Sequence, residues 1–302
     1  IVTGITHDHL DYHVSPEAYR QAKRKIFTHL KRGALVLLCA DDPVCMSLLG
    51  DVPGHARVRT FGINSDADIQ ATSVACSRQG TRFRVQNGAS CGEIETSLIG
   101  AHNVLNCLAA IGATEHFGVE MVDIQQGLAG LKSIPGRLER VDAEQPFSVY
   151  IDYAHTEDAI RRAIESVRRV TTGRVLIVFG AGGDRDASKR FGMGRAGSLA
   201  DLCFLTSDNP RSESPEAIIE QIRAGFEQGR CELHVETDRQ LAIEKALQLA
   251  RPGDAVLIAG KGHETVQVIG SQRIPFDDAQ VCRQFLKQFS SGHQLSPQRR
   301  TA

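Results

Sequence analysis

Four short stretches in the second half of this sequence carry closely spaced polar and charged residues. They are Asp152-Tyr153-Ala154-His155, Gly180–Arg190, Ser207–Arg211 and Gly260–Glu264. Arginine and lysine bind carboxylates and phosphates, carboxylates bind amines, and glycine-rich backbone leaves amide groups free for a ligand. These residue types therefore favour recognition of a small molecule that carries both signs of charge.

Each of these stretches follows an apolar run that predicts a strand. Val175–Phe179 is apolar throughout, which is typical of a strand covered on both faces of a parallel sheet. Helical patterns alternate with these strands, and this alternation predicts a parallel sheet with helices on both faces. The five expected strands are Val149–Asp152, Val175–Phe179, Leu202–Thr206, Leu233–Glu236 and Ala255–Ala259. Because the carboxyl ends of parallel strands share one edge, we expect the four polar stretches to form one site there.

The first half begins with a helix that carries a lysine on its apolar face. Ser15 is a suitable N-cap and Pro16 suits the first helical position, so we expect a helix to about Leu30. Its apolar positions are Tyr19, Ala22, Ile26, Phe27 and Leu30, and Lys23 falls among them. Two interpretations stay open for Lys23. Its ammonium can extend to the surface, or the amine can be part-buried, with a lowered pKa, and take part in chemistry.

Strands and turns fill residues 33–100, and two polar features stand out around them. Asp41-Asp42-Pro43 either binds a metal or ends a strand and caps the next helix. Asn103 and Asn106 begin a helix that runs to about Phe117, and both face the same way. Capping explains one of the two amides, and the second suggests a hydrogen bond to a ligand. The expected strands are Ala34–Ala40, Val58–Ile63, Ile69–Ala75, Arg82–Val85 and Ile94–Ile99.

The Pro135-Gly136 pair interrupts two well-patterned regions and predicts a hinge. A helix at Met121–Leu131 precedes it, and the alternating strands and helices follow it. We therefore predict an α/β protein with two domains, a partial central domain at 1–136 and a Rossmann-like domain with a mainly parallel sheet at 137–302.

Composition narrows the class of partner. The net charge is −1, which gives no reason to expect nucleic acid or a membrane surface. The eight cysteines form no C-x-x-C pair and mostly lie in apolar runs, as in a reducing compartment, so we expect a cytoplasmic protein. The chain opens on Ile1, directly into a histidine-rich motif, which suggests a piece of something longer.

Eight ordered motifs make the chain resemble the Mur ligases, the ATP-dependent amide-forming enzymes of peptidoglycan synthesis. The resemblance covers nearly the whole chain. The motifs are D-H-L-D-Y-H at 8–13, Y-x-x-A-K at 19–23, H-N-x-x-N at 102–106, G-R-x-E at 136–139, D-Y-A-H-T at 152–156, G-G-D-R-D-x-x-K-R at 182–190, D-N-P-R at 208–211 and G-K-G-H-E at 260–264.

The resemblance implies roles for individual residues. His9 matches a magnesium ligand, and Lys23 matches a lysine that is carbamylated and helps hold that magnesium. Asn103 and Asn106 match residues around the adenine of ATP. Of the remaining nucleotide-binding positions, Arg137 matches a residue near the phosphates, Asp152 matches one that binds the ribose, and His155 is expected to line the same pocket.

The resemblance also implies an amino-acid pocket. Asp208-Asn209-Pro210-Arg211 resembles the signature of members that add meso-diaminopimelate, and Arg190, Gly260 and Glu264 complete that pocket. Diaminopimelate is lysine with an additional carboxylate at its far end. A guanidinium can bind that carboxylate through two hydrogen bonds, and Glu264 can pair with the amine beside it.

The implied activity is that of an ATP- and Mg²⁺-dependent ligase that acts as a monomer. It activates the γ-carboxylate of D-glutamate in UDP-MurNAc-L-Ala-D-Glu as an acyl phosphate and joins it to meso-diaminopimelate. Two departures from the family pattern stand out. Phe191 replaces a usual proline, and no G-x-x-x-x-G-K-[ST] phosphate loop occurs in the 302 residues. We therefore expect the carboxyl-terminal part of a ligase, inactive alone.

Three alternatives remain. One is another amide ligase of the superfamily, either lysine-adding or related to cyanophycin or folylpolyglutamate synthetases. Another is a non-catalytic, nucleotide-binding remnant of such a ligase. The third, a Rossmann dinucleotide-binding module, is weakened because Arg185 falls where the third glycine of G-x-G-x-x-G belongs.

Overall fold

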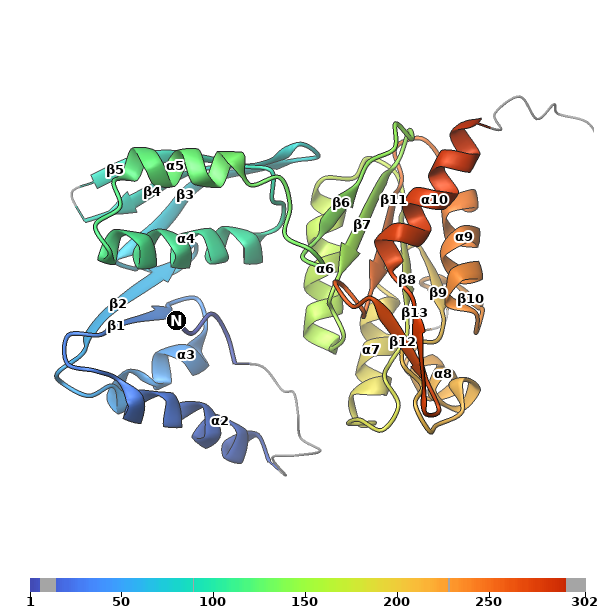
Figure 1. The fold of residues 1–302 in the computed structure, drawn as a ribbon, viewed down its shortest axis with the longest axis horizontal. Helices are drawn as coiled ribbons and strands as arrows, with labels where there is room; N and C mark the ends of the chain where they lie inside the picture. The colour runs from blue at the N-terminus through green and yellow to red at the C-terminus, as the bar shows by residue number, and fades with distance from the viewer. Residues whose placement is uncertain (6–14, 89, 228, 292–302) are drawn as a thin grey trace, which may run out of the picture. The chain divides into compact units, whose positions relative to one another are not determined.

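The computed structural model describes residues 1–5, 15–88, 90–227 and 229–291 (Figure 1). The chain divides into two compact units, Ile1–Ile134 and Pro135–Ala302, two residues before the predicted boundary. Within the described ranges, no helix is long and apolar enough to cross a membrane.

Unit 1 is built on a five-stranded sheet with the order β1-β2-β3-β4-β5. Its strands are β1 (Leu35–Cys39), β2 (Arg57–Gly62), β3 (Ile69–Ser77), β4 (Gly80–Asn87) and β5 (Ser90–Thr96). The first three run parallel, and β4 and β5 follow as antiparallel neighbours. Val2 bridges the other edge of β1, where its N–H donates to Leu37 O at 2.8 Å. The sheet is therefore mixed.

Unit 1 contains six helical segments among its described residues. They are α2 (Pro16–Arg24), η1 (Lys25–His29), α3 (Pro43–Ser47), η2 (Leu49–Asp51), α4 (Ala101–His116) and α5 (Met121–Gly130). Along α4, Val104, Leu108 and Ile111 recur at three- to four-residue spacing and are buried against Leu37 and Ile69 of the sheet. Helix α5 packs on β5. Apolar periodicity thus determines which face of α4 is covered.

The first helix differs from the prediction. It is α-helical only to Arg24 and then tightens into the 3-10 turn η1, which ends before Leu30 adopts an extended backbone. Because a 3-10 turn has three residues per turn, the predicted apolar stripe is broken. Phe27 is buried, whereas Ile26 is 56% exposed.

The Asp41-Asp42 pair ends β1 and organises the turns around it. Asp42 Oδ1 accepts hydrogen bonds from the N–H groups of Val44 and Cys45 at 2.8 and 3.2 Å, which caps α3. The carboxylate of Asp41 accepts backbone N–H groups from residues 63–65. The capping interpretation is confirmed, and no group of three or more potential metal-ligating side chains occurs among the described residues.

Unit 2 contains a six-stranded sheet with the order β10-β9-β8-β11-β7-β6. Its strands are β6 (Glu139–Val141), β7 (Ser148–Asp152), β8 (Val175–Phe179), β9 (Leu202–Leu205), β10 (Glu232–Val235) and β11 (Ala255–Ala259). All pair in parallel except β6, which is antiparallel to β7. Every residue of β7, β8, β9 and β11 is buried, so both faces of the central sheet are covered, as predicted.

The helices of unit 2 cover the two faces. Helices α6 (Glu157–Arg169), α7 (Lys189–Gly197) and α8 (Pro215–Arg223) pack in succession on one face, and α9 (Arg239–Leu249) and α10 (Asp278–Ser291) pack together on the other (Figure 1). Alternate strand residues point to opposite faces. Leu176 and Val178, for example, contact the α9–α10 layer through the core that also contains Ile243 and Leu286. The doubly covered α/β fold is confirmed.

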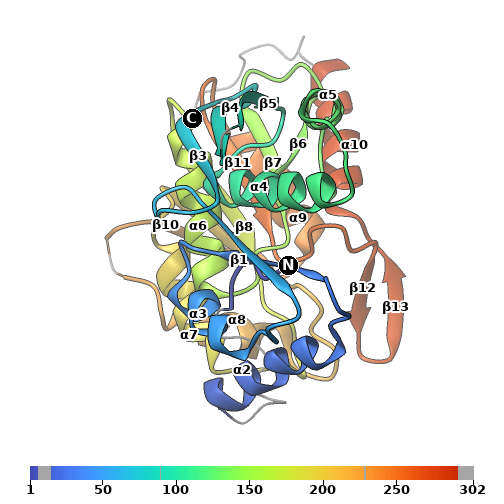
Figure 2. The same ribbon diagram turned by 90° about the vertical axis from the view of Figure 1, so that its left-hand side faces the viewer.

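Three strands of unit 2 were missed in the sequence. One is the short edge strand β6, and the other two form the hairpin of β12 (Val266–Ile269) and β13 (Gln272–Pro275). Figure 2 shows this hairpin as a separate ribbon beside the main sheet. All four residues of β13 are exposed, so its sequence carries little of the apolar alternation that predicts a strand. The hairpin matters because β12 contacts the polar stretches described next.

Candidate active site

The four polar stretches of unit 2 meet at one edge of the sheet. They follow β7, β8, β9 and β11, four strands that are adjacent and parallel. Gly260, with φ of 111°, lies so close to Asp208 that a Cβ there would be 2.6 Å from Asp208 Oδ2. A Cβ on Gly262, with φ of 54°, would be 2.7 Å from the Cβ of Tyr153. Only glycine combines these backbone angles with such close approach. The predicted convergence of the stretches is therefore observed.

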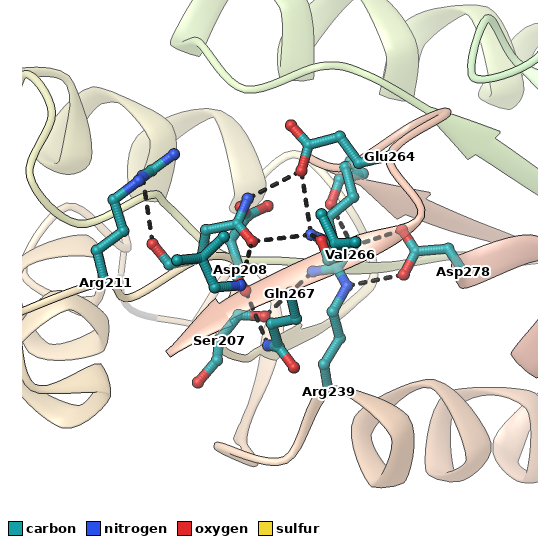
Figure 3. Close-up of polar contacts among 12 residues, drawn as sticks. Ser207, Asp208, Arg211, Arg239, Glu264, Val266, Gln267 and Asp278 are labelled. Carbon is teal, nitrogen blue, oxygen red and sulfur yellow. Dashed lines mark hydrogen bonds and ion pairs between the residues drawn. The ribbon is translucent and has the colours of Figure 1, made fainter. Parts of the chain in front are cut away.

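Arg211 and Glu264 lie on either side of Asp208 in this edge (Figure 3). Arg211 Nη1 donates to Gly183 O at 2.7 Å, and no carboxylate of a described residue forms an ion pair with its guanidinium. Glu264 Oε2 accepts from Asn209 Nδ2 at 2.8 Å. Burial raises the pKa of Glu264, but the Asn209 hydrogen bond and the nearby Lys261 and Arg211 charges hold it below its usual value. The edge thus presents an arginine with free donors and an ionised carboxylate.

Asp208 and Arg190, two further predicted residues, are buried within the same edge. Burial raises the pKa of Asp208, against the attraction of Arg239 and Lys261. Arg190 is bound to Glu213 through both Nη atoms, at 2.7 and 2.8 Å, and also donates to Gly182 O at 3.1 Å. These contacts place Arg190 as a support of the Gly182–Arg190 loop, and its direct contact with an amino acid stays a prediction.

The predicted nucleotide residues of unit 2 gather around Tyr153. The Arg137 guanidinium carbon lies 5.6 Å from the Tyr153 ring centroid, and the rings of His155 and His263 lie 4.7 and 5.4 Å from it. Asp152 accepts backbone N–H groups from Leu138 at 2.8 Å and Ala154 at 2.9 Å, and burial raises its pKa. This combination of cationic and aromatic side chains suits phosphate and a flat ring.

The other predicted residues belong to unit 1. Asn103 is buried at the start of α4, where its Nδ2 donates to Ile99 O at 2.9 Å and its Oδ1 accepts from Asn106 Nδ2 at 3.3 Å. The two amides thus lie on the same side of the helix start, as expected, and there they are hydrogen-bonded to each other. Lys23 is exposed, with Nζ 5.1 Å from the centroid of the Tyr19 ring, so the interpretation as a part-buried amine is wrong. His9 lies outside the described residues.

Sequence reasoning missed three buried charged residues that hold the edge together. They are Lys261, Arg239 and Asp278, all of them fully buried. Arg239 binds Asp278 through Nε and Nη2, each at 2.8 Å, and also donates to Ala259 O and Ser207 O at 3.0 and 3.3 Å. This pair therefore joins the first turns of α9 and α10 to the ends of β11 and β9. A signal existed, because Arg239 precedes the buried Ala242 and Ile243 by three and four residues and so lies on the apolar face.

Replacing Asp278 with asparagine is expected to destabilise unit 2 by about 3–5 kcal/mol, because it leaves a buried guanidinium without its counter-charge. Denaturant unfolding of the chain measures the change. The exposed pair of Arg223 and Glu220 is the matched control, and Glu220→Gln is expected to cost less than about 1 kcal/mol. Equal stability of the two variants would show that the Arg239–Asp278 pair contributes nothing of its own.

Family models match both units of the chain. The Mur ligase middle domain matches residues 1–114, and the Mur ligase glutamate ligase domain matches residues 136–262. Together with the converging motifs at the carboxyl edge, these matches identify the class of protein. The chain belongs to the Mur ligase family.

Individual relatives point to one branch of this family. The UDP-N-acetylmuramoyl-L-alanyl-D-glutamate–2,6-diaminopimelate ligase of Caldanaerobacter subterraneus subsp. tengcongensis is 40% identical over 287 residues, which cover 95% of this chain and 58% of the relative. A solved structure of a ligase with the same name is 31% identical, with a TM-score of 0.61 over 96% of this chain and 60% of that one. The chain thus spans a little over half the length of these relatives.

A more distant structure shares the fold. The folylpolyglutamate synthase of Mycobacterium tuberculosis, solved with ADP and AMPPCP, aligns with a TM-score of 0.71 over 99% of this chain and 64% of that one. Its sequence identity is 20%, so the likeness extends to the arrangement of strands and helices alone.

Proposed function

We propose that these 302 residues form the carboxyl-terminal part of the ligase that adds meso-diaminopimelate to UDP-MurNAc-L-Ala-D-Glu. The observation that carries this proposal is the pair of unlike charges at the carboxyl edge of unit 2. Arg211 has guanidinium donors that no described carboxylate occupies, and Glu264 is held ionised. The far end of diaminopimelate carries a carboxylate and an ammonium on one carbon. The two side chains therefore match both charges at this end, of which the carboxylate distinguishes diaminopimelate from lysine.

The reaction that we propose has two steps. The γ-carboxylate of D-glutamate first attacks the γ-phosphorus of ATP, which forms an acyl phosphate and releases ADP. The neutral amine of diaminopimelate then attacks the acyl carbon, an amide bond forms, the nitrogen loses one proton to solvent, and inorganic phosphate leaves with the pair of electrons from the broken C–O bond. Arg211 and Glu264 contribute by holding the far end of the amino acid, so that its other amine is presented to the acyl carbon.

ATP and magnesium are the proposed cofactors. Arg137, Tyr153 and His155 form a surface suited to the nucleotide, and the relative in complex with ADP and AMPPCP supports a nucleotide site in this fold. Magnesium would neutralise charge on the transferring phosphoryl group. Its proposed ligands are His9 and carbamylated Lys23. We further propose that the ligase acts as a monomer in the cytoplasm. Its other substrate is the nucleotide-linked dipeptide.

An amide-ligase assay tests the proposal. The protein expressed from its complete reading frame is incubated with ATP, magnesium, UDP-MurNAc-dipeptide and either meso-diaminopimelate or L-lysine, and tripeptide is measured by mass spectrometry. We expect diaminopimelate to be preferred by roughly 30-fold or more, since an unpaired buried charge costs at least about 2 kcal/mol. Equal use of lysine would instead favour a lysine-adding ligase. The chain 1–302 is assayed in parallel and is expected to form no tripeptide, because it contains no phosphate loop.

A further inference from the structure

Lys261 is fully buried, which is rare for a lysine. It lies between Gly260 and Gly262, whose positive φ angles and close contacts with Asp208 and Tyr153 fix the backbone on both sides. The side chain is directed into the edge of the sheet and not toward solvent. Such burial of an ammonium is tolerated only where hydrogen-bond acceptors replace water.

The Lys261 ammonium has a partner for each of its three protons. Nζ donates to Val266 O at 2.7 Å, to Asn209 Oδ1 at 3.1 Å and to Glu264 Oε2 at 3.1 Å (Figure 3). An ammonium has three donors and no acceptor. Lys261 therefore has no donor left for a substrate, and any effect that it has on binding must act through these partners.

Through these contacts Lys261 sets the orientation of Asn209. Asn209 Oδ1 accepts from Lys261 and from the Val268 N–H at 2.9 Å, and its Nδ2 donates to Glu264. A flipped amide would turn its NH₂ group toward two donors, so the lysine determines which end of Asn209 faces Glu264.

Glu264 is held in the same way. Its Oε2 atom accepts hydrogen bonds from both Lys261 and Asn209. Its Oε1 atom makes no hydrogen bond or ion pair with the part of the chain that the structure describes. The free oxygen can accept from an incoming ammonium. Strand β12 is bound to this cluster through Val266 and Val268, and it also holds Arg211, whose N–H donates to Val268 O at 3.1 Å. One ammonium therefore connects the acidic and the basic side of the pocket.

We propose that Lys261 is the positioning residue of the amino-acid pocket: it fixes Glu264 and Asn209 to recognise the substrate ammonium and, through β12, sets the distance from Glu264 to Arg211. The inference rests on the proposed function, because it takes this pocket to bind diaminopimelate.

The test is binding of meso-diaminopimelate to the chain 1–302 by ligand-observed NMR titration, for the wild type and Lys261→Met. The variant removes the charge at similar side-chain volume, and we expect affinity to fall by about 10-fold or more, as for loss of a partner in a buried charged network. Affinity for ADP should be unchanged. Lys245→Met is the matched control, since Lys245 is exposed and forms an ion pair with the half-buried Glu236 on the same unit.

The pH profile separates positioning from general loosening. Without Lys261 the pKa of Glu264 should rise, because burial and the negative charge of Asp208 still raise it, while the Asn209 hydrogen bond and the Arg211 charge alone remain to lower it. The variant should therefore lose affinity more steeply than the wild type as the pH falls from about 7 to about 5. A merely loosened fold would weaken binding equally across this range, and that result would contradict the proposal.

Two further variants complete the design. Adding Glu264→Gln to Lys261→Met should cost little more than the larger single loss, because the two residues act as one unit. If Lys261→Met does not fold, Lys261→Gln keeps a donor without the charge and should show the same pH profile. Failure of the wild type to bind diaminopimelate would overturn the proposed function and this inference with it. Equal binding by wild type and variant, with equal pH profiles, would overturn the inference alone.

Discussion

Replacing Arg211 with alanine should lower kcat/KM for meso-diaminopimelate by roughly 30- to 1000-fold, while the rate with L-lysine changes far less. Arg211 is half-buried, and its guanidinium meets only carbonyl oxygens among the described residues, Gly183 O at 2.7 Å and Asn209 O at 3.4 Å. A substrate carboxylate would thus be its first anionic partner. Lysine lacks that carboxylate and has nothing to lose when the guanidinium is removed.

The measurement is a steady-state comparison of both amino acids with the enzyme expressed from its complete reading frame. Arg223→Ala is the matched control, since Arg223 is exposed on α8 and pairs only with Glu220 among the described residues. Arg211→Lys keeps the charge but loses the planar fork, so an intermediate loss is expected. Equal losses for diaminopimelate and lysine would mean that Arg211 is structural.

The backbone at Arg211 offers an additional control. Its φ is 52°, in the left-handed region, which costs about 1–2 kcal/mol for a residue with a Cβ. Alanine keeps this strain and glycine relieves it, so Arg211→Gly separates loss of the guanidinium from any change in the loop. We expect the two variants to share the same defect with diaminopimelate. An arginine in a backbone conformation that favours glycine is consistent with a requirement for the arginine side chain at this position.

The architecture of unit 2 could be predicted because its signals are local. Apolar runs such as Val175–Phe179 define buried strands, and parallel pairing then requires their carboxyl ends to share an edge. The convergence of Asp152, Asp208, Arg211 and Glu264 on that edge follows from topology alone. In contrast, β13 has four exposed residues and carries little such signal, so the hairpin that supports Arg211 was missed.

Side-chain partners could not be predicted to the same degree. Arg239 and Asp278 are 39 residues apart, and their pairing depends on how α9 and α10 pack. Lys261 looked like one more charge in a polar loop, because the sequence does not show which way a side chain between two glycines points. The same limit explains Lys23. The predicted apolar stripe around Lys23 required an α-helix that continues to Leu30. The chain instead changes to a 3-10 turn after Arg24, so the apolar residues that follow Lys23 do not continue that stripe.

Lys23→Ala is expected to reduce ligase activity by at least about 100-fold, since a metal that stabilises transition-state charge is worth several kcal/mol. The side chain is exposed, so its amine is accessible to CO₂. Carbamylation turns a cation into an anion and so gives up the contact between Nζ and the Tyr19 ring, worth about 0.5–1 kcal/mol at an exposed site. A carbamate at Lys23 therefore needs a cation to stabilise it. Whether the carbamate persists is then also a test of metal binding.

Two readouts distinguish this role from a structural one. The carbamate should give a carbonyl signal in ¹³C NMR after incubation with labelled bicarbonate and magnesium, and the signal should be absent in Lys23→Ala. Short-chain carboxylates added to the variant should restore part of the activity by replacing the lost anion. Lys25→Ala, which removes an exposed lysine two residues further on, is the control and should behave as the wild type. Near-normal activity of Lys23→Ala would exclude the carbamate role, because the reaction would then proceed without the negative charge that the carbamate supplies.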